Sequence, residues 1–135
     1  MKFKLYPERK IRHLLSMPFI YGMILPALVL DLTLEVYHTI CFPLYGIAYV
    51  KRKNYIRIDR QKLEYLTFME KLNCMYCGYV NGLFAYAVQV AAETEKYWCS
   101  IKHKSDASFK APTHHESFLE YGDKKAYQEI TAEKE

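Results

Sequence analysis

The hydrophobic and polar positions divide the chain into an apolar N-terminal part and a more polar remainder. Residues 14–30 carry no charge, and this run of about 17 residues is close to the minimum that crosses a bilayer core. Apolar residues continue to position 50, but Pro18 and Pro26 each remove a backbone donor and are expected to kink a helix. A return over residues 36–50, past Pro43 and Gly46, predicts a kinked or re-entrant membrane hairpin. The alternative is a hydrophobic hairpin buried in a soluble complex.

The second half of the chain has the spacing of helices. Leu63, Leu66 and Met69 recur at helical intervals, and Asp59 is the expected N-cap. Asn81-Gly82 is a turn signal, and residues 83–98 form a second predicted helix. Beyond residue 104 the chain is polar, with one short helix expected around residues 117–130. The sequence therefore predicts an all-α protein whose membrane hairpin is followed by a small helical hairpin and a loose tail.

Basic residues lie on both sides of the apolar segment. We divide the chain into a basic N-terminal segment (1–13), a membrane-associated hairpin (14–50), a basic interfacial segment with a cysteine-rich helical hairpin (51–104) and a polar, weakly ordered tail (105–135). No convincing cleavage site follows the apolar run, so we expect it to be retained. Lysine and arginine on both flanks favour placing both flanks on the cytoplasmic face. The 13 tyrosines suit a membrane interface or a wet partner surface.

The basic block "KRKNYIRIDRQK" indicates a polyanionic partner. Beside an apolar segment, these charges fit anionic lipid headgroups at about 1 kcal/mol each. Interleaved Tyr and Arg could instead contact nucleic acid, which is the less favoured interpretation. We therefore predict a lipid bilayer as the partner, with a membrane protein as a further possible partner.

Three polar residues interrupt the apolar segment at helical spacing. Asp31, Glu35 and His38 are four and three positions apart, which places them on one helix face. Glu-x-x-His is also a ligand spacing of di-iron carboxylate bundles, but the further carboxylates of such a site have no matching motif here. A polar stripe that faces the protein interior or the interface is the favoured interpretation.

Cysteines and one histidine supply the candidate metal ligands. Cys74 and Cys77 form C-x2-C, and Cys99 and His103 form C-x3-H, which is ligand spacing for zinc, and thiolates also suit iron. One unbroken helix over residues 83–98 would span about 24 Å, so a single site requires the chain to fold back. Cys41 could complete a site with either pair. A Cys74/Cys77 dithiol redox couple, and cysteines without ligands, remain alternatives.

Two stretches carry a resemblance to a known group of proteins. "CMYCGYVNG" (74–82) and "TEKYWCSIKH" (94–103), together with "FPLYGIAYVKRKNYIRIDR", resemble a group of small, uncharacterised, membrane-associated bacterial proteins. The resemblance covers about two thirds of the chain and implies that the two cysteine stretches belong together. From the resemblance together with the basic flanks, we predict a location at the bacterial inner membrane, with the soluble half in the cytoplasm.

The sequence assigns no reaction. A glycine-rich phosphate loop and a serine nucleophile elbow are both absent, so enzymatic activity stays open. The prediction is a membrane-associated accessory or scaffold protein that binds zinc or iron through Cys74, Cys77, Cys99 and His103. The alternatives are a thiol or iron redox or metal-handling protein, and a small subunit of a membrane complex without chemistry of its own.

Overall fold

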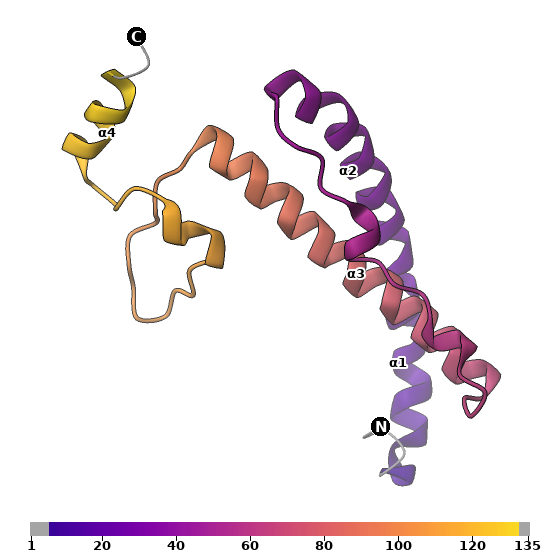
Figure 1. Cartoon of the computed structure of the whole chain (residues 1–135). Coiled ribbons are helices and arrows are strands. Elements are labelled where there is room, and N and C mark those ends of the chain that lie inside the picture. Colours follow the sequence, from indigo (N-terminus) through magenta and orange to yellow (C-terminus); the bar gives the residue numbers. More distant parts are fainter. Residues whose placement is uncertain (1–5, 133–135) are drawn as a thin grey trace.

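The computed structural model describes residues 6–132, and this part of the chain is helical (Figure 1). The α-helices are α1 (Lys10–Gly22), α2 (Ile24–Tyr45), α3 (Phe68–Trp98) and α4 (Lys124–Ala132). Short 3-10 turns are η2 (Pro7–Arg9), η3 (Arg52–Asn54), η4 (Arg60–Lys62) and η5 (Thr113–Ser117). Extended pairing within residues 6–132 is limited to one isolated bridge between Ile101 and Leu119. The all-α prediction is confirmed.

Helices α1 and α2 follow one another as a single bent helix of 36 residues, Lys10–Tyr45. The bend lies at Gly22–Met23, four residues before Pro26, whose ring nitrogen has no hydrogen for the Gly22 carbonyl. The chain does not reverse within residues 14–45. The reversal comes at Gly46, which has a left-handed φ of 69° and ends α2, while the Ile47 amide donates to the Phe42 carbonyl at 2.9 Å.

Residues 46–67, here called the return segment, lead back along α2 and α3 to the start of α3 (Figure 1). Its backbone lies directly on α3. A Cβ atom on Gly82 would stand 2.7 Å from the Tyr55 carbonyl oxygen, and one on Gly78 would stand 2.6 Å from that of Arg57. Both helical glycines are therefore required by close approach of the return segment rather than by an unusual backbone conformation.

Helix α3 is continuous over 31 residues, and this corrects two expectations. The turn expected at Asn81-Gly82 is wrong, because both residues lie inside the helix. Its N-cap is Thr67 rather than Asp59. The Thr67 hydroxyl accepts from the Glu70 amide at 3.4 Å, and the Glu70 carboxylate accepts from the Thr67 amide at 3.0 Å. This reciprocal pair is a capping box, which satisfies two otherwise unpaired donors.

The core lies between α2 and α3. Phe42, Leu83 and Tyr86 are fully buried, and Ala27 and Val90 are almost so. Side chains of the return segment also pack against this cluster, among them Val50, Tyr55 and Ile56. None of the described residues of α1 is buried.

The C-terminal residues fold back onto the end of α3. The Lys102 amide donates to the Leu119 carbonyl, and the Leu119 amide donates to the Ser100 carbonyl, both at 2.8 Å. Phe118 is buried, at 5% exposure. The helix expected around residues 117–130 begins later, because residues 118–119 are used in this pairing, and α4 covers Lys124–Ala132.

Candidate functional site

The four predicted metal ligands do not meet within one chain. Cys74 and Cys77 lie one turn apart in the N-terminal part of α3, whereas Cys99 follows its last residue. Because α3 is unbroken, the step from Cys77 to Cys99 covers about 33 Å at 1.5 Å per residue, far beyond a shared zinc ion. The expectation of one Cys74/Cys77/Cys99/His103 site is therefore wrong for a single chain. The cysteines at 41, 74, 77 and 99 are all free thiols.

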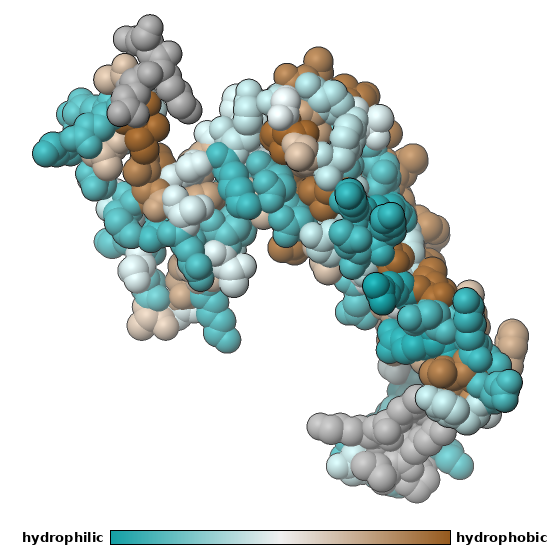
Figure 2. Space-filling model, in the orientation of Figure 1, coloured by the Kyte–Doolittle hydropathy of each residue, from teal (hydrophilic) through white to brown (hydrophobic). Residues whose placement is uncertain are grey.

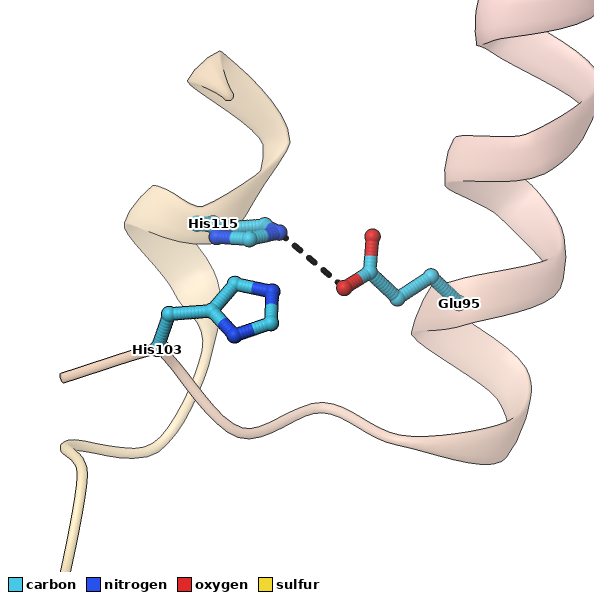
Figure 3. Close-up of side chains that lie close together, drawn as sticks. All are labelled: Glu95, His103 and His115. Atoms are coloured by element: carbon cyan, nitrogen blue, oxygen red, sulfur yellow. Dashed lines mark hydrogen bonds and ion pairs between the residues drawn. The ribbon is translucent and has the colours of Figure 1, made fainter. Parts of the chain in front are cut away.

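His103 instead meets two residues that the sequence interpretation did not select. One potential ligand atom each from Glu95, His103 and His115 lies within 4.8 Å of the other two. Glu95 lies in the last turn of α3, His103 in the following loop and His115 in η5. Figure 3 shows the two imidazole rings beside the Glu95 carboxylate. Three separate segments thus bring a carboxylate and two imidazoles to one point.

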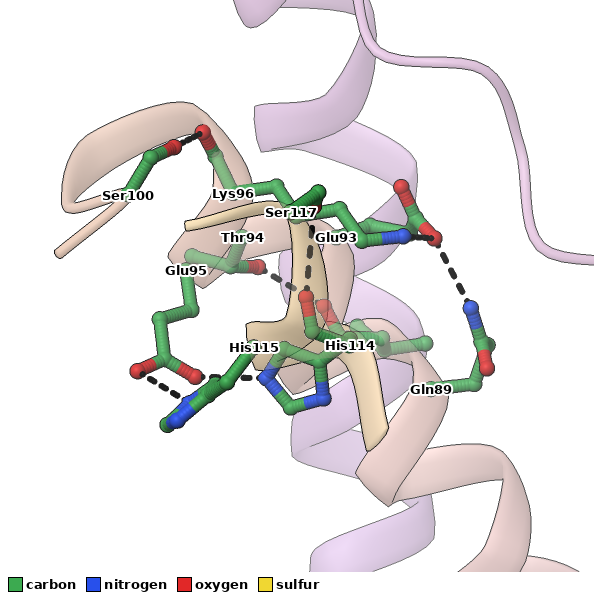
Figure 4. Close-up of polar contacts among 10 residues, drawn as sticks. Gln89, Glu93, Thr94, Glu95, Lys96, Ser100, His114, His115 and Ser117 are labelled. Carbon is green, nitrogen blue, oxygen red and sulfur yellow. Dashed lines mark hydrogen bonds and ion pairs between the residues drawn. The ribbon is translucent and has the colours of Figure 1, made fainter. Parts of the chain in front are cut away.

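Hydrogen bonds fix the Glu95 carboxylate between two neighbouring histidines (Figure 4). His114 Nε2 lies 2.7 Å from Glu95 Oε2, and His115 Nε2 lies 3.1 Å from Oε1. The His114 contact holds the pKa of Glu95 below its usual range, with a further lowering by His115 and an opposing effect of burial. Glu95 is therefore an anion, as a metal ligand must be.

His115 is the most enclosed member of the group. It is only 3% exposed, its ring stacks on Phe118 with centroids 4.8 Å apart, and its Nδ1 is buried without a hydrogen-bond partner. A buried polar atom without a partner is costly and calls for a ligand or water. His103 and His115 also line a cavity of about 650 Å³, to which Lys102, Lys104 and Tyr121 contribute. The group therefore combines a buried ligand with access from solvent.

The polar residues of α2 form a second cluster with the return segment. Arg52 Nη2 donates to Asp31 Oδ2 at 2.7 Å, and Arg52 Nη1 donates to Glu35 Oε1 at 3.2 Å. The Tyr79 hydroxyl donates to Asp31 Oδ2 at 2.7 Å, and burial together with this bond raises the pKa of Tyr79. Bonding to Asp31 raises the pKa of Arg52, so the guanidinium stays charged. The carboxylates are thus paired with Arg52 rather than free to bind a metal.

His38 extends this cluster into the core. It is 4% exposed, and its Nε2 accepts from the Val50 amide at 3.1 Å. In the neutral ring Nδ1 therefore carries the proton and faces the Tyr86 hydroxyl at 3.0 Å. Both ring nitrogens are engaged. The prediction of an inward polar stripe on α2 agrees with these contacts, and a metal role for Glu35 and His38 finds no support in them.

The opposite face of α2 is apolar and exposed. We call it the outer stripe, and all six of its members are at least half exposed: Leu25, Leu28, Leu32, Val36, Ile40 and Leu44. Helix Lys10–Tyr45 is long and apolar enough to cross a membrane, and only 6% of its most apolar window is buried. Helix α2 thus turns its charged residues inward and its aliphatic residues outward.

Comparison with known proteins adds nothing to this description. The chain matches no protein-family model, no curated protein and no solved structure. The resemblance based on the two cysteine stretches therefore stays a prediction.

Proposed function

We propose that this chain is a membrane-associated accessory protein that binds one divalent metal ion, zinc or iron, through Glu95, His103 and His115. The observation that carries the proposal is the convergence of these three side chains from α3, the following loop and η5 within 4.8 Å. The proposed site therefore lies at the end of α3 rather than at the cysteines, and His103 is the one predicted ligand that belongs to it.

The ligand set is suitable for such an ion. Two imidazoles and one carboxylate hold zinc with a fourth position left for water, and the same set binds ferrous iron with open positions. A bound ion would cross-link the end of α3 to residues 113–119, in addition to the backbone pairing at Leu119 and the burial of Phe118. This cross-link supports a structural role, because His115 and Phe118 are the only buried residues of segment 113–119 and form a small core.

Membrane association is supported by the two faces of α2. The solvent-facing side of a water-soluble helix is mostly polar, but α2 exposes the aliphatic outer stripe and pairs Asp31 with Arg52 on its protein side. Lipid is a medium in which this arrangement is favourable. Basic residues before α1 and in the return segment favour anionic headgroups and a cytoplasmic location of the polar parts.

Metal content of purified full-length protein tests the proposal. We expect about one equivalent of zinc or iron per chain, lost in Glu95→Gln and in His103→Ala. The double variant Cys74→Ser/Cys77→Ser is the matched control and should keep its metal. Circular dichroism checks that each variant is still helical.

The same samples decide between the proposal and its alternatives. Metal that leaves with the cysteines and stays without Glu95 would overturn the proposed site. Metal-free protein whose Cys74 and Cys77 oxidise to an intramolecular disulfide would support a dithiol couple instead. Metal-free protein with unreactive thiols would leave a small membrane-complex subunit without chemistry of its own.

A further inference from the structure

The exposed charges of the return segment lie beside the polar face of α2, at the middle of that helix. Arg52 is bonded to Asp31 of α2. Its neighbours Lys51 and Lys53 are exposed, as are Arg57 and Arg60 further along the segment. Figure 2 shows hydrophilic residues over the side on which the return segment lies, and hydrophobic residues along the edge formed by α1 and α2. Because Arg52 is bonded to Asp31, Lys51 and Lys53 must lie at nearly the same depth in a membrane as Asp31.

This linkage decides how α2 can meet a bilayer. If α2 itself crossed the bilayer, Asp31 would lie inside the hydrocarbon, because it lies about 10 Å from one end of α2 and about 21 Å from the other at 1.5 Å per residue. Lys51 and Lys53 would then face lipid without a partner among the described residues. A charged side chain at that depth is strongly disfavoured. An orientation in the membrane plane avoids this, because the outer stripe alone enters the apolar layer.

We propose that the bent helix Lys10–Tyr45 lies in the plane of the membrane surface, with the outer stripe in the lipid and the return segment at the water side. This inference rests on the proposed membrane association and adds its geometry. The lipid partner is an anionic bilayer, whose headgroups suit the basic residues around the helix.

Aromatic residues at both ends of α2 fit the same arrangement. Tyr45 stacks on Tyr97 at 5.1 Å and lies edge-on to Trp98 at 5.3 Å between ring centroids. At the other end Tyr21 and Tyr76 pack edge-on at 5.7 Å. Tyrosine and tryptophan prefer the headgroup level. In the in-plane orientation the aromatic groups at the two ends of α2 both lie at the headgroup level, while the polar side of the molecule stays in water.

Tryptophan fluorescence can measure the depth of each position, because Trp98 is the single tryptophan of the chain. We would prepare Trp98→Phe and then add Leu25→Trp, Leu32→Trp or Leu44→Trp, which are exposed positions at which the core is unaffected. Each full-length variant is bound to vesicles of phosphatidylcholine and phosphatidylglycerol whose acyl chains are brominated near the headgroup or near the terminal methyl. Lys53→Trp in the same background is the control for the water side.

The in-plane orientation predicts the same shallow quenching at positions 25, 32 and 44, and little quenching at position 53. A crossing helix predicts unequal depths, with the deepest quenching at position 32 if α2 spans the core or at position 25 if residues 14–30 span it, since Leu32 and Leu44 differ by about 18 Å along the axis. That depth profile, or strong deep quenching at position 53, would overturn the inference while leaving membrane association intact. Absence of vesicle binding by all variants and by the original chain would instead overturn the proposed association, and the orientation with it.

Discussion

Arg52 of the return segment and Asp31 of α2 form a two-pronged ion pair in which Nη2 donates to Oδ2 at 2.7 Å. The Asp31 side chain is 15% exposed and that of Arg52 is 36% exposed. Glu35 also accepts a hydrogen bond from Arg52, and the Tyr79 hydroxyl also donates one to Asp31. This pair explains why charged residues occur within an apolar helix: they hold the return segment against the face of α2 that lies away from the outer stripe.

Removing one partner of this pair should be more harmful than removing both. Asp31→Leu leaves the Arg52 guanidinium partly buried with Glu35 as its remaining anion, and we expect a loss of about 1–3 kcal/mol in the free energy of unfolding. The double variant Asp31→Leu/Arg52→Met should recover much of this loss. Urea denaturation in mild detergent, followed by circular dichroism, measures both. A double variant that is as unstable as the sum of the two single variants would contradict the coupling.

Gly82 should tolerate no side chain while the return segment stays in place. The Cβ atom of Gly82→Ala would lie 2.7 Å from the Tyr55 carbonyl oxygen and 2.8 Å from Ile56 Cα, and both are backbone atoms. We expect a loss of about 1–3 kcal/mol in stability, as for other overpacked sites. Thermal denaturation measures the change.

Gly22→Ala is the matched control for this prediction, since an added Cβ there meets nothing within 4 Å. It should leave stability unchanged or raise it, because alanine favours helix more than glycine does. Equal melting temperatures for Gly82→Ala and the original chain would mean that the return segment does not lie on α3.

The periodicity of the sequence was enough to predict an all-α chain and a polar stripe on α2, but not the bounds of α2 and α3. Spacings of four and three residues place Asp31, Glu35 and His38 on one face in any α-helix. The error at Asn81-Gly82 has a physical cause. A glycine that permits a turn and a glycine that admits another backbone look the same in sequence, and only the position of Tyr55 separates the two cases.

The candidate site was only partly accessible to sequence reasoning. His103 was selected for its spacing from Cys99, but its structural partners come from elsewhere. His115 reaches the end of α3 because residues 100–102 pair with Leu119, a contact formed by backbone groups that leave little trace in the residue pattern. The adjacent pair His114-His115 was the available signal. No local pattern, however, shows that residue 115 is buried.

Acid should loosen the contact between Glu95 and η5 in the metal-free protein. The pKa of Glu95 is lowered in the folded state, chiefly by its bond with His114, so its ionised form is the one that the fold stabilises. That contribution is complete above the ordinary pKa near 4.5 and is lost as the pH falls through the lowered value. Hydrogen exchange of the backbone amides in residues 113–119 should therefore accelerate as the pH is lowered below about 4.5, after correction for intrinsic rates.

Glu95→Gln is the control for this titration, because the amide has no proton to gain in this range. Its corrected exchange rates in residues 113–119 should be faster at neutral pH and nearly independent of pH below it. Identical pH profiles for the variant and the original chain would show that another group holds the segment.

Burial of the Tyr86 hydroxyl raises its pKa and commits it to the neutral, hydrogen-bonding form beside His38. Tyr86→Phe keeps the ring in the core but leaves His38 Nδ1 without its bond. We expect a loss of about 1–3 kcal/mol in the free energy of unfolding, the usual cost of an unsatisfied buried donor. Metal content should stay unchanged, because Tyr86 and the Glu95 site lie on different parts of α3. A variant of equal stability would contradict the bond.

The length of α3 makes a direct prediction about thiol chemistry. A disulfide needs Cα atoms about 4.4–6.8 Å apart, whereas Cys77 and Cys99 are separated by about 33 Å of continuous helix. In the variant Cys41→Ser/Cys74→Ser, oxidation should therefore give free thiols or dimers linked between chains, but no intramolecular bridge. Mass spectrometry after thiol alkylation distinguishes these products. The positive control, in a cysteine-free background, is Ile101→Cys/Leu119→Cys, which lie opposite each other in a bridge and should close readily. An intramolecular Cys77–Cys99 disulfide would require α3 to break between them, and would restore the single cysteine site that the helix excludes.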